Sequence, residues 1–327
     1  MDDAAPQTGE LVVAGGEHIP ALLKAIEERL LAEAVGYGPP LQQYGEATVA
    51  AGGKRLRPLL MLLCAGPPSS ELQREALVRG GAAIELIHSA TLVHDDVLDQ
   101  ADLRRGKPTV IAAAGREAAI STGDMLFARA FVTITQSGDS RAVEILSAAC
   151  SALARGELMQ RADGWDVSIS RERYLERCEL KTARLFEAAC EIGTTVAGEP
   201  QLELASFGRK IGIAFQVLDD VLDVSGPAER TGKDRGTDLL DGTVTLPLII
   251  AREIDPGVAG IDLRSLASAT EAEELCDQIA ATGALEQSRA FALSLVVEAT
   301  QGLPSELDER RRLSLELVAN SVVARYS

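Results

Sequence analysis

The chain has 327 residues, of which 46% are hydrophobic and only 3% aromatic, and its formal net charge is −17. A core of Ala, Leu, Ile and Val favours packed helices over a β-sandwich. The negative charge disfavours nucleic-acid binding, and a solvated acidic surface accounts for most of the excess. Five scattered cysteines without a CxxC pair are typical of small core residues in a reducing compartment.

The N-terminal segment 1–16 is acidic and rich in Gly and Ala, without the basic and apolar stretches of a signal peptide. We expect it to be disordered and residues 17–327 to form a single all-helical domain. No uninterrupted apolar run has the length of a membrane span, so we expect a cytoplasmic protein without one.

Apolar periodicity predicts helices along almost all of the remaining chain. The first has Leu22, Leu23, Ile26, Leu30 and Leu31 on its apolar face. In chain order, the first half of the sequence predicts helices at Ile19–Ala34, Leu41–Ala51, Arg57–Ala65 and Glu71–Asp99, a basic loop over Asp102–Pro108, and two helices within Ala112–Gln136 that meet around Ser121-Thr122-Gly123.

The second half continues in the same way. It predicts helices at Arg141–Ala162, Ser170–Thr195 with Ser170 as N-cap, and Glu203–Val224, a loop over Gly226–Gly242, and helices from Leu246 on with breaks near Pro256, Gly283 and Pro304. The expected fold is an all-α bundle of about ten or more helices around a central cavity.

Two aspartate clusters with the same spacing each end an apolar helical run: Asp95-Asp96-Val97-Leu98-Asp99 and Asp219-Asp220-Val221-Leu222-Asp223. Residues i and i+4 of a helix share a face, so the outer aspartates of each cluster point the same way. Like charges near the negative end of a helix dipole destabilise the helix unless a cation binds there. The clusters therefore predict Mg²⁺ and a phosphate-bearing substrate. The alternative for a single cluster is a solvated acidic helix end.

Two basic stretches carry complementary charge. Gly52–Pro58 places Lys54, Arg55 and Arg57 beside two glycines that let a ligand approach the backbone, and Arg104–Pro108 follows the first cluster directly. Arginine donates paired hydrogen bonds to phosphate oxygens. Either stretch alone could merely neutralise aspartates. Both together favour a diphosphate held by metal and by side chains.

Four further residues bear on the same site. His88 lies two turns before Asp95, Gln216 lies one turn before Asp219, and Lys181-Thr182 sits within an apolar helix. A lone His or Gln on such a face is more often structural, so these residues are candidates only through their register with the aspartates.

The ordered set of motifs resembles the trans-prenyl diphosphate synthases of the class I isoprenoid synthase superfamily. The stretches are GGKRLRP (Gly52–Pro58), Glu85–Thr109, GEL (Gly156–Leu158), KTA (Lys181–Ala183), FQVLDDVLD (Phe215–Asp223) and GKDRGTDL (Gly232–Leu239). Any one of them is weak, whereas their order over residue 19 to the C-terminus is specific.

The resemblance implies a homodimer that condenses isopentenyl diphosphate with an allylic diphosphate: dimethylallyl, geranyl or farnesyl diphosphate. It implies three Mg²⁺ ions on the allylic diphosphate, held by Asp95, Asp96, Asp99, Asp219 and Asp223. The implied direct cationic contacts of that diphosphate are Arg104, Lys181 and Lys233. The isopentenyl diphosphate site would comprise Lys54, Arg57, His88 and Arg105, with Arg55 as a further donor, while Thr182 and Gln216 would line the carbocation.

Product length should depend on the residues behind the first cluster. We expect the product tail to run from Asp95 toward the N-terminus of its helix, where the small Thr91 and Ala90 form the floor. Family members that stop at fifteen carbons resemble each other in having an aromatic residue there, so we expect products of at least twenty carbons. The alternative is a floor set by a neighbouring helix through Phe127, Phe131 or Met159.

One residue departs from the family pattern: Thr243 stands where many members have lysine, which puts one ancillary diphosphate contact in doubt. Two other interpretations remain open. A terpene cyclase of this fold typically has an Asn/Ser/Glu-type second metal motif, which Asp219–Asp223 is not. The chain could also be the catalytic, or a regulatory, subunit of a heteromeric long-chain synthase, although a regulatory subunit would be expected to lose a cluster.

Overall fold

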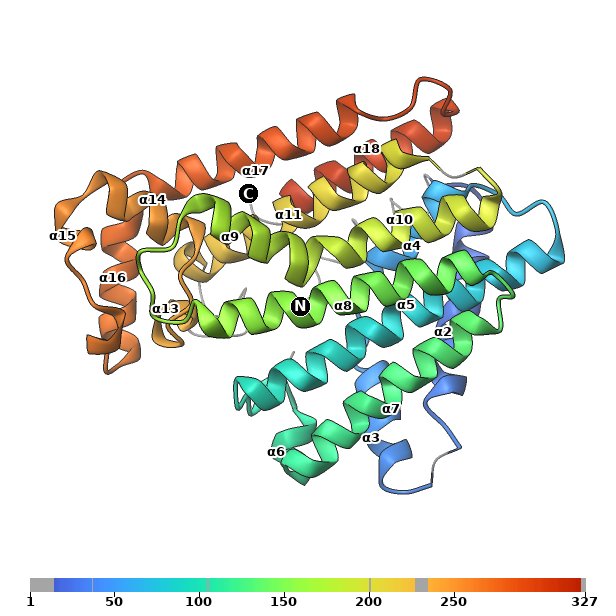
Figure 1. Cartoon of the computed structure of the whole chain (residues 1–327), viewed down its shortest axis with the longest axis horizontal. Coiled ribbons are helices and arrows are strands. Elements are labelled where there is room, and N and C mark those ends of the chain that lie inside the picture. The colour runs from blue at the N-terminus through green and yellow to red at the C-terminus, as the bar shows by residue number, and fades with distance from the viewer. Residues whose placement is uncertain (1–14, 37, 105, 200, 227–234, 325–327) are drawn as a thin grey trace. The chain divides into compact units, whose positions relative to one another are not determined.

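The computed structural model describes residues 15–36, 38–104, 106–199, 201–226 and 235–324, and it is built from helices (Figure 1). Within these ranges the only sheet is an antiparallel pair of two-residue strands, β1 (Leu103–Arg104) and β2 (Lys107–Pro108). The expected all-α class is confirmed. The tail expected to be disordered lies outside the described residues up to position 14.

The described chain divides into two compact units. The first comprises residues 15–150, 185–205 and 303–318, and the second comprises residues 151–184, 206–302 and 319–324. The single domain with a central cavity, expected from the sequence, stays a prediction.

The first unit is built around one long helix, α5 (Glu71–Leu98), which packs most extensively against α7 (Arg116–Thr135). Ser70 caps α5 by accepting a hydrogen bond from the N–H of Gln73. By length and composition α5 could cross a membrane, but 78% of its apolar window is buried, as in the core helix of a globular protein. The other helices that lie wholly in this unit are α2 (His18–Glu33), α3 (Leu41–Ala50), α4 (Leu56–Ala65) and α6 (Val110–Ala114).

The break between α6 and α7 differs from the sequence prediction. The two helices meet at Gly115, whose φ of 84° ends α6, whereas α7 runs unbroken through Ser121-Thr122-Gly123. Gly123 instead lies against a side chain of α5: a Cβ at this position would come within 2.2 Å of His94 Nε2. The expected break was therefore wrong, because this glycine permits close helix packing.

Apolar periodicity places α2 on the core. Ile19, Leu22, Ile26 and Leu30 are at most 2% exposed, and each such side chain contributes about 1.5–3 kcal/mol on burial. Leu31, expected on the same face, is 44% exposed. The buried stripe is therefore narrower than the sequence predicted.

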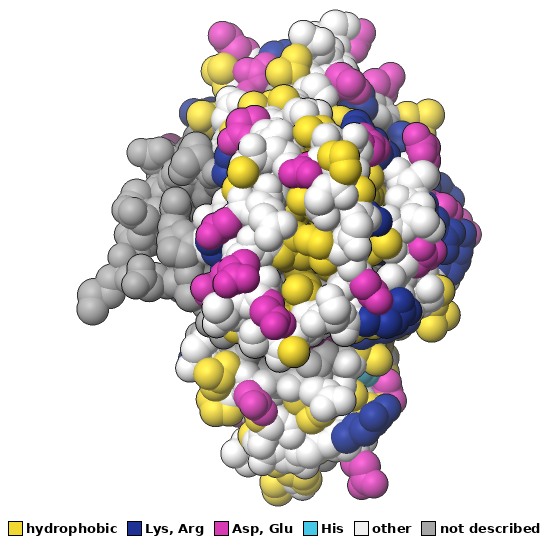
Figure 2. Space-filling model, turned by 90° about the vertical axis from the view of Figure 1, so that its left-hand side faces the viewer, with side chains coloured by type: hydrophobic (Ala, Val, Ile, Leu, Met, Phe, Trp, Pro, Cys, Tyr) yellow, Lys and Arg dark blue, Asp and Glu magenta, His cyan; other side chains and the backbone are white. Residues whose placement is uncertain are grey.

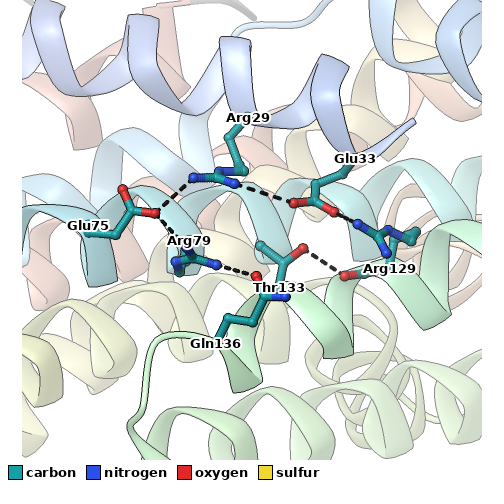
Figure 3. A network of polar contacts seen from close by, with 7 residues as sticks. All are labelled: Arg29, Glu33, Glu75, Arg79, Arg129, Thr133 and Gln136. Atoms are coloured by element: carbon teal, nitrogen blue, oxygen red, sulfur yellow. Dashed lines mark hydrogen bonds and ion pairs between the residues drawn. The ribbon is translucent and has the colours of Figure 1, made fainter. Parts of the chain in front are cut away.

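A polar network fastens α2 to α5 and α7 (Figure 3). Glu75 on α5 accepts from Arg29 and pairs with Arg79, each at 2.8 Å. Glu33 on α2, which is almost fully buried, pairs with Arg29 at 3.8 Å and with Arg129 on α7. These ion pairs fix the three helices in register.

The second unit contains a π-helical segment, η1 (Glu179–Ala183), that directly continues α9 (Arg171–Cys178). Ser170 caps α9 by accepting from the N–H of Arg173, as predicted. Further elements of this unit are α13 (Thr237–Leu240), α14 (Leu246–Ile254), α15 (Pro256–Ala259), η2 (Leu263–Ser265), α16 (Ala269–Ala281) and α17 (Ala284–Gln301). The expected break at Gly283 is confirmed as the N-cap of α17, while part of the expected loop Gly226–Gly242 lies outside the described residues.

The division between the units falls within four helices. These are α8 (Ser140–Ala162), α10 (Arg184–Ala197), α11 (Leu202–Ser225) and α18 (Glu309–Ala324).

Acidic side chains are dispersed on the face drawn in Figure 2, where they lie singly or in small groups among hydrophobic and basic ones. On this face the net negative charge thus takes the form of a solvated surface.

Candidate functional site

The first aspartate cluster forms the C-terminal end of α5. Asp99 is the C-cap residue, and its N–H donates to the carbonyl of Asp95 at 2.8 Å. Gln100 then adopts the left-handed conformation with φ 50°, and the N–H of Ala101 returns to the carbonyl of Asp96 at 3.0 Å. This is a Schellman ending. It leaves Asp95 half-buried and Asp99 exposed, while Asp96 is buried.

A short hairpin then brings basic side chains back to the cluster. Leu103 pairs with Pro108, and Arg104 with Lys107, across β1 and β2. Arg104 Nε donates to Asp96 Oδ1 at 2.7 Å, so the buried carboxylate is charge-compensated. Arg105, a predicted substrate-binding residue, lies outside the described residues.

A cavity of about 110 Å³ lies in the first unit between the end of α3, the second half of α5 and the hairpin. Its ionisable lining residues are Arg55, Glu85, His88, Asp96, Arg104 and Lys107. Four of the six are basic, which suits the binding of an anion. The cavity thus brings together Arg55, His88 and Arg104, which the sequence placed in one site.

Arg55 occupies the junction of four helices. It precedes α4 in the left-handed conformation, with φ 47°. Its Nη1 donates to Glu85 of α5 at 2.8 Å, its Nη2 donates to the carbonyl of Val49 of α3 at 3.1 Å, and its Nε pairs with Glu27 of α2. The Glu27 and Glu85 carboxylates raise the pKa of Arg55. Its guanidinium is therefore engaged with protein groups, and its role as a substrate donor stays a prediction.

Arg57 lies two residues further on, within α4, in a different environment. Its guanidinium stacks on the ring of Phe186 at 4.4 Å, and its Nε has no hydrogen-bond partner among the described residues. Burial lowers the pKa of Arg57 to about 10, so it is a cation at neutral pH. A buried N–H donor of a cation that lacks a hydrogen-bond partner lowers the stability of the fold unless an anion accepts its hydrogen bond. Lys54, the third basic residue of this stretch, is exposed.

The second aspartate cluster lies on α11, in the second unit. Asp219 is exposed, and half-buried Asp223 accepts from the N–H of Asp238 at 3.3 Å. Asp220 is buried and accepts from Tyr174 Oη at 2.6 Å and from Gln216 Nε2 at 2.8 Å. Burial raises the pKa of Asp220 to about 7, and the negative charge of Asp238 contributes to the same shift. Lys233, a predicted diphosphate contact, lies outside the described residues.

Lys181 and Thr182 lie in the π-helical segment η1, against α8. Gly156 makes this approach possible, since a Cβ there would come within 2.5 Å of the backbone N of Lys181. The neighbouring Glu157 accepts from Lys181 Nζ at 2.6 Å. Thr182 Oγ1 donates to Gln216 Oε1 at 2.6 Å. The two short stretches GEL and KTA therefore form one packed unit.

The proposed floor residues are both on α5 but differ in burial. Ala90 is completely buried, whereas Thr91 is half-buried and donates its hydroxyl to the carbonyl of His88 at 2.8 Å. Neither is among the residues that line the cavity. The alternative floor residues Phe127, Phe131 and Met159 are half-buried, and the ring of Phe127 stacks on His94 at 5.8 Å.

Comparison with known proteins shows which family these motifs belong to. Residues 39–282 match the model of the family described as polyprenyl synthetase. The chain belongs to the polyprenyl synthetase family. It is 38% identical over 304 residues to component 2 of the heptaprenyl diphosphate synthase of Geobacillus stearothermophilus, covering 90% of this chain and 93% of that one.

Other members of the family have different product names. The chain is 33% identical to the geranylgeranyl diphosphate synthase of Methanosarcina mazei, over 85% of this chain and 87% of the relative. The crystal structure of a decaprenyl diphosphate synthase from Rhodobacter capsulatus superposes with a TM-score of 0.88 at 30% identity, covering 98% of this chain and 99% of that one.

Prenyl diphosphate synthases use Mg²⁺, and the donor chemistry of this polyprenyl synthetase fits that ion. Within the described residues, no three His, Cys, Asp or Glu side chains converge to hold a metal. Mg²⁺ binding does not require such a cage, because the ion takes one or two carboxylates and completes its shell with water and phosphate oxygens. Asp95 and Asp99 offer this on α5, as do Asp219 and Asp223 on α11.

Several residues that contact the predicted site residues were not singled out by the sequence analysis. Glu27 and Glu85 hold Arg55, Glu157 holds Lys181, and Tyr174 holds Asp220. Each pair is separated by 24 to 46 residues. Glu85 and Glu157 lie inside the quoted motifs, so their position was a usable signal, whereas Glu27 and Tyr174 carry none.

Proposed function

We propose that this chain condenses isopentenyl diphosphate with an allylic diphosphate, head to tail, to give a polyprenyl diphosphate of at least twenty carbons. The observation that carries the proposal is the cavity beside the C-terminal end of α5. Basic side chains line this cavity next to the aspartate cluster that ends the helix. The names of the relatives, which run from geranylgeranyl to decaprenyl, support chain elongation and leave the length open.

The basic residues divide into two proposed groups. Lys54, Arg57, His88 and Arg105 bind isopentenyl diphosphate. Arg57 supports this because its buried Nε has no hydrogen-bond partner in the part of the chain that the structure describes. Arg104, Lys181 and Lys233 bind the allylic diphosphate. Thr243, in place of the usual lysine, uses its N–H to hold the carbonyl of Asp238 at 2.8 Å and contributes no charge.

The reaction breaks a carbon–oxygen bond of the allylic diphosphate. Asp95, Asp99, Asp219 and Asp223 would hold Mg²⁺, which would supply charge stabilisation for the departing diphosphate. Arg104 and Lys181, already fixed by Asp96 and Glu157, add preorganised positive charge. The oxygen atoms of Thr182 and Gln216 stabilise the allylic cation. The double bond of isopentenyl diphosphate attacks this cation and forms the new carbon–carbon bond, and the released diphosphate takes up the proton that the resulting cation loses.

The test is product analysis of the purified chain with Mg²⁺, isopentenyl diphosphate and a series of allylic diphosphates. We expect elongated diphosphates, and a loss of about a hundredfold or more in kcat for Asp95→Asn and Asp219→Asn. Hydrocarbon from farnesyl diphosphate without isopentenyl diphosphate would instead indicate a terpene cyclase. No turnover with any primer would contradict the proposal for the chain alone.

A heteromeric enzyme is the second candidate, because the relative from Geobacillus stearothermophilus is named as one component of its synthase. Our proposal is a cytoplasmic homodimer that turns over by itself, which light scattering and the same assay would test together. Activity that appears only with a second, unrelated subunit would favour the heteromer.

A further inference from the structure

The second aspartate of the α11 cluster does not face solvent as its neighbour does. Asp219 is exposed, whereas Asp220 is only 5% exposed and accepts hydrogen bonds on both carboxylate oxygens. Its donors, Tyr174 and Gln216, are neutral, unlike the arginine that pairs with Asp96 in the first cluster. A buried carboxylate held in this way is costly, so its retention needs a reason beyond metal binding.

The two bonds of Gln216 fix which way its side-chain amide points. When Asp220 is ionised its carboxylate only accepts hydrogen bonds, so it holds the Gln216 NH₂ group toward Oδ1, at 2.8 Å. The amide is planar, so its oxygen faces the opposite side, where it accepts from Thr182 Oγ1 at 2.6 Å. A flipped amide would lose the bond to Asp220, because its oxygen would face a carboxylate oxygen, and its NH₂ group would then point toward Thr182, whose hydroxyl would have to accept rather than donate.

Tyr174 completes a connected chain of four side chains. It is fully buried on α9, and its hydroxyl donates to Asp220 Oδ2 at 2.6 Å. The chain runs from Tyr174 through Asp220 and Gln216 to Thr182, and so links α9, α11 and η1. Thr182 lies next to Lys181, whose ammonium group is itself held by Glu157 at 2.6 Å.

We infer that Tyr174 and Asp220 are positioning residues, which act by orienting the Gln216 amide and through it Thr182. The inference rests on the proposed function, in which a cation forms near these groups. Oxygen atoms oriented in advance stabilise positive charge, while the NH₂ hydrogens of a flipped amide would repel it. Asp220 thus helps to stabilise the carbocation by orienting Gln216, and not by binding Mg²⁺.

The experiment compares Tyr174→Phe and Asp220→Asn in the full-length enzyme. Both substitutions keep side-chain shape, and Asn can present either oxygen or nitrogen to Gln216, so the orientation is no longer enforced. We expect kcat to fall by about tenfold to a hundredfold. We also expect KM for both diphosphates and the half-saturating Mg²⁺ concentration to stay within about twofold of wild type. Arg171→Ala, on the exposed side of α9, is the control and should leave all these quantities unchanged.

A double-mutant cycle then shows whether the effect of Asp220 on kcat is transmitted through Gln216. In a Gln216→Leu background, Asp220→Asn should cost less than about twofold in kcat, because the group it orients is gone. Full additivity, or a marked rise in the Mg²⁺ requirement of Asp220→Asn alone, would overturn the inference and make Asp220 a metal ligand. Failure of the wild-type chain to turn over would instead count against the proposed function.

Discussion

At the scale of single residues, neighbours in one motif have different roles because their surroundings differ. Arg55 is bound by two carboxylates and a carbonyl, whereas Arg57, two positions later, stacks on Phe186 and its Nε has no hydrogen-bond partner among the residues described. Arg55 also holds a left-handed backbone conformation that is unfavourable for a side chain with a Cβ. Its ion pairs therefore stabilise the shape of the segment that carries Lys54 and Arg57.

Arg55→Lys should weaken isopentenyl diphosphate binding, because lysine cannot reproduce the fork that contacts Glu27 and Glu85 together. We expect KM for isopentenyl diphosphate to rise about tenfold and the free energy of unfolding to fall by about 1–3 kcal/mol. Glu27→Gln should show the same KM effect although Glu27 carries no positive charge for the substrate. Steady-state kinetics and chemical denaturation measure both.

The matched control is Arg29→Lys, which disturbs a comparable network between α2, α5 and α7 (Figure 3). It should lower stability without changing KM. If Glu27→Gln left KM unchanged while Arg55→Lys raised it, Arg55 would be a direct substrate ligand.

The floor hypothesis is best tested at Thr91, because this residue is half-buried while Ala90 has no free surface. Thr91→Phe should shorten the products, since the ring occupies the space one turn behind Asp95. Ala90→Phe should also destabilise the fold, by about 1–3 kcal/mol, through overpacking. Chromatography of the dephosphorylated products measures length, and Leu72→Phe, 85% exposed on the same helix, is the control. Unchanged products in Thr91→Phe would favour Phe127, Phe131 or Met159 as the floor.

At the scale of helices, function depends on close approaches that only glycine permits. Gly156 brings α8 against the π-helical segment η1, and π-helical turns of this kind often occur at functional sites. The contact carries Lys181 and Thr182, so the position of this segment and the chemistry of its side chains are coupled.

Gly156→Ala should push η1 away from α8, because the new Cβ would lie 2.5 Å from a backbone nitrogen that cannot rotate aside. We expect a loss of about 1–3 kcal/mol in stability and a fall in kcat that is larger than any change in KM for isopentenyl diphosphate. The neighbouring exposed residue provides the comparison, since Arg155→Ala should affect neither. Wild-type kcat in a destabilised Gly156→Ala would show that η1 tolerates the displacement.

At the scale of the whole molecule, ligand binding should increase the free energy of unfolding. A ligand that binds only the folded state raises the free energy of unfolding by about 2.7 kcal/mol at a hundred times its Kd. Inorganic diphosphate with Mg²⁺ should therefore raise the Tm by a few degrees, more than either component alone. Asp95→Asn combined with Asp219→Asn should abolish this synergy, whereas Leu72→Phe should keep it. An equal shift in the double variant would place the ion elsewhere.

The helices and the aspartate registers were predictable from the sequence, because both follow from local spacing along the chain. Apolar periodicity located α5 to within one residue of its end, and the i, i+4 rule put the outer aspartates of each cluster on one face. Gly123 shows where such reasoning fails. A glycine within a helical pattern predicts a helix break, but here the glycine leaves room for the side chain of His94 on another helix.

The sequence by itself determined the family, the helical class and the residue types of the site, since ordered motifs and their spacing are local properties. Tertiary structure decided which aspartate of each pair is buried, why Arg55 differs from Arg57, and which way Gln216 points. Several of these outcomes depend on partners far away in the sequence, such as Glu27, 28 residues from Arg55, and Tyr174, 46 residues from Asp220. Only packing brings such groups together, because burial and hydrogen bonding are properties of the assembled helices.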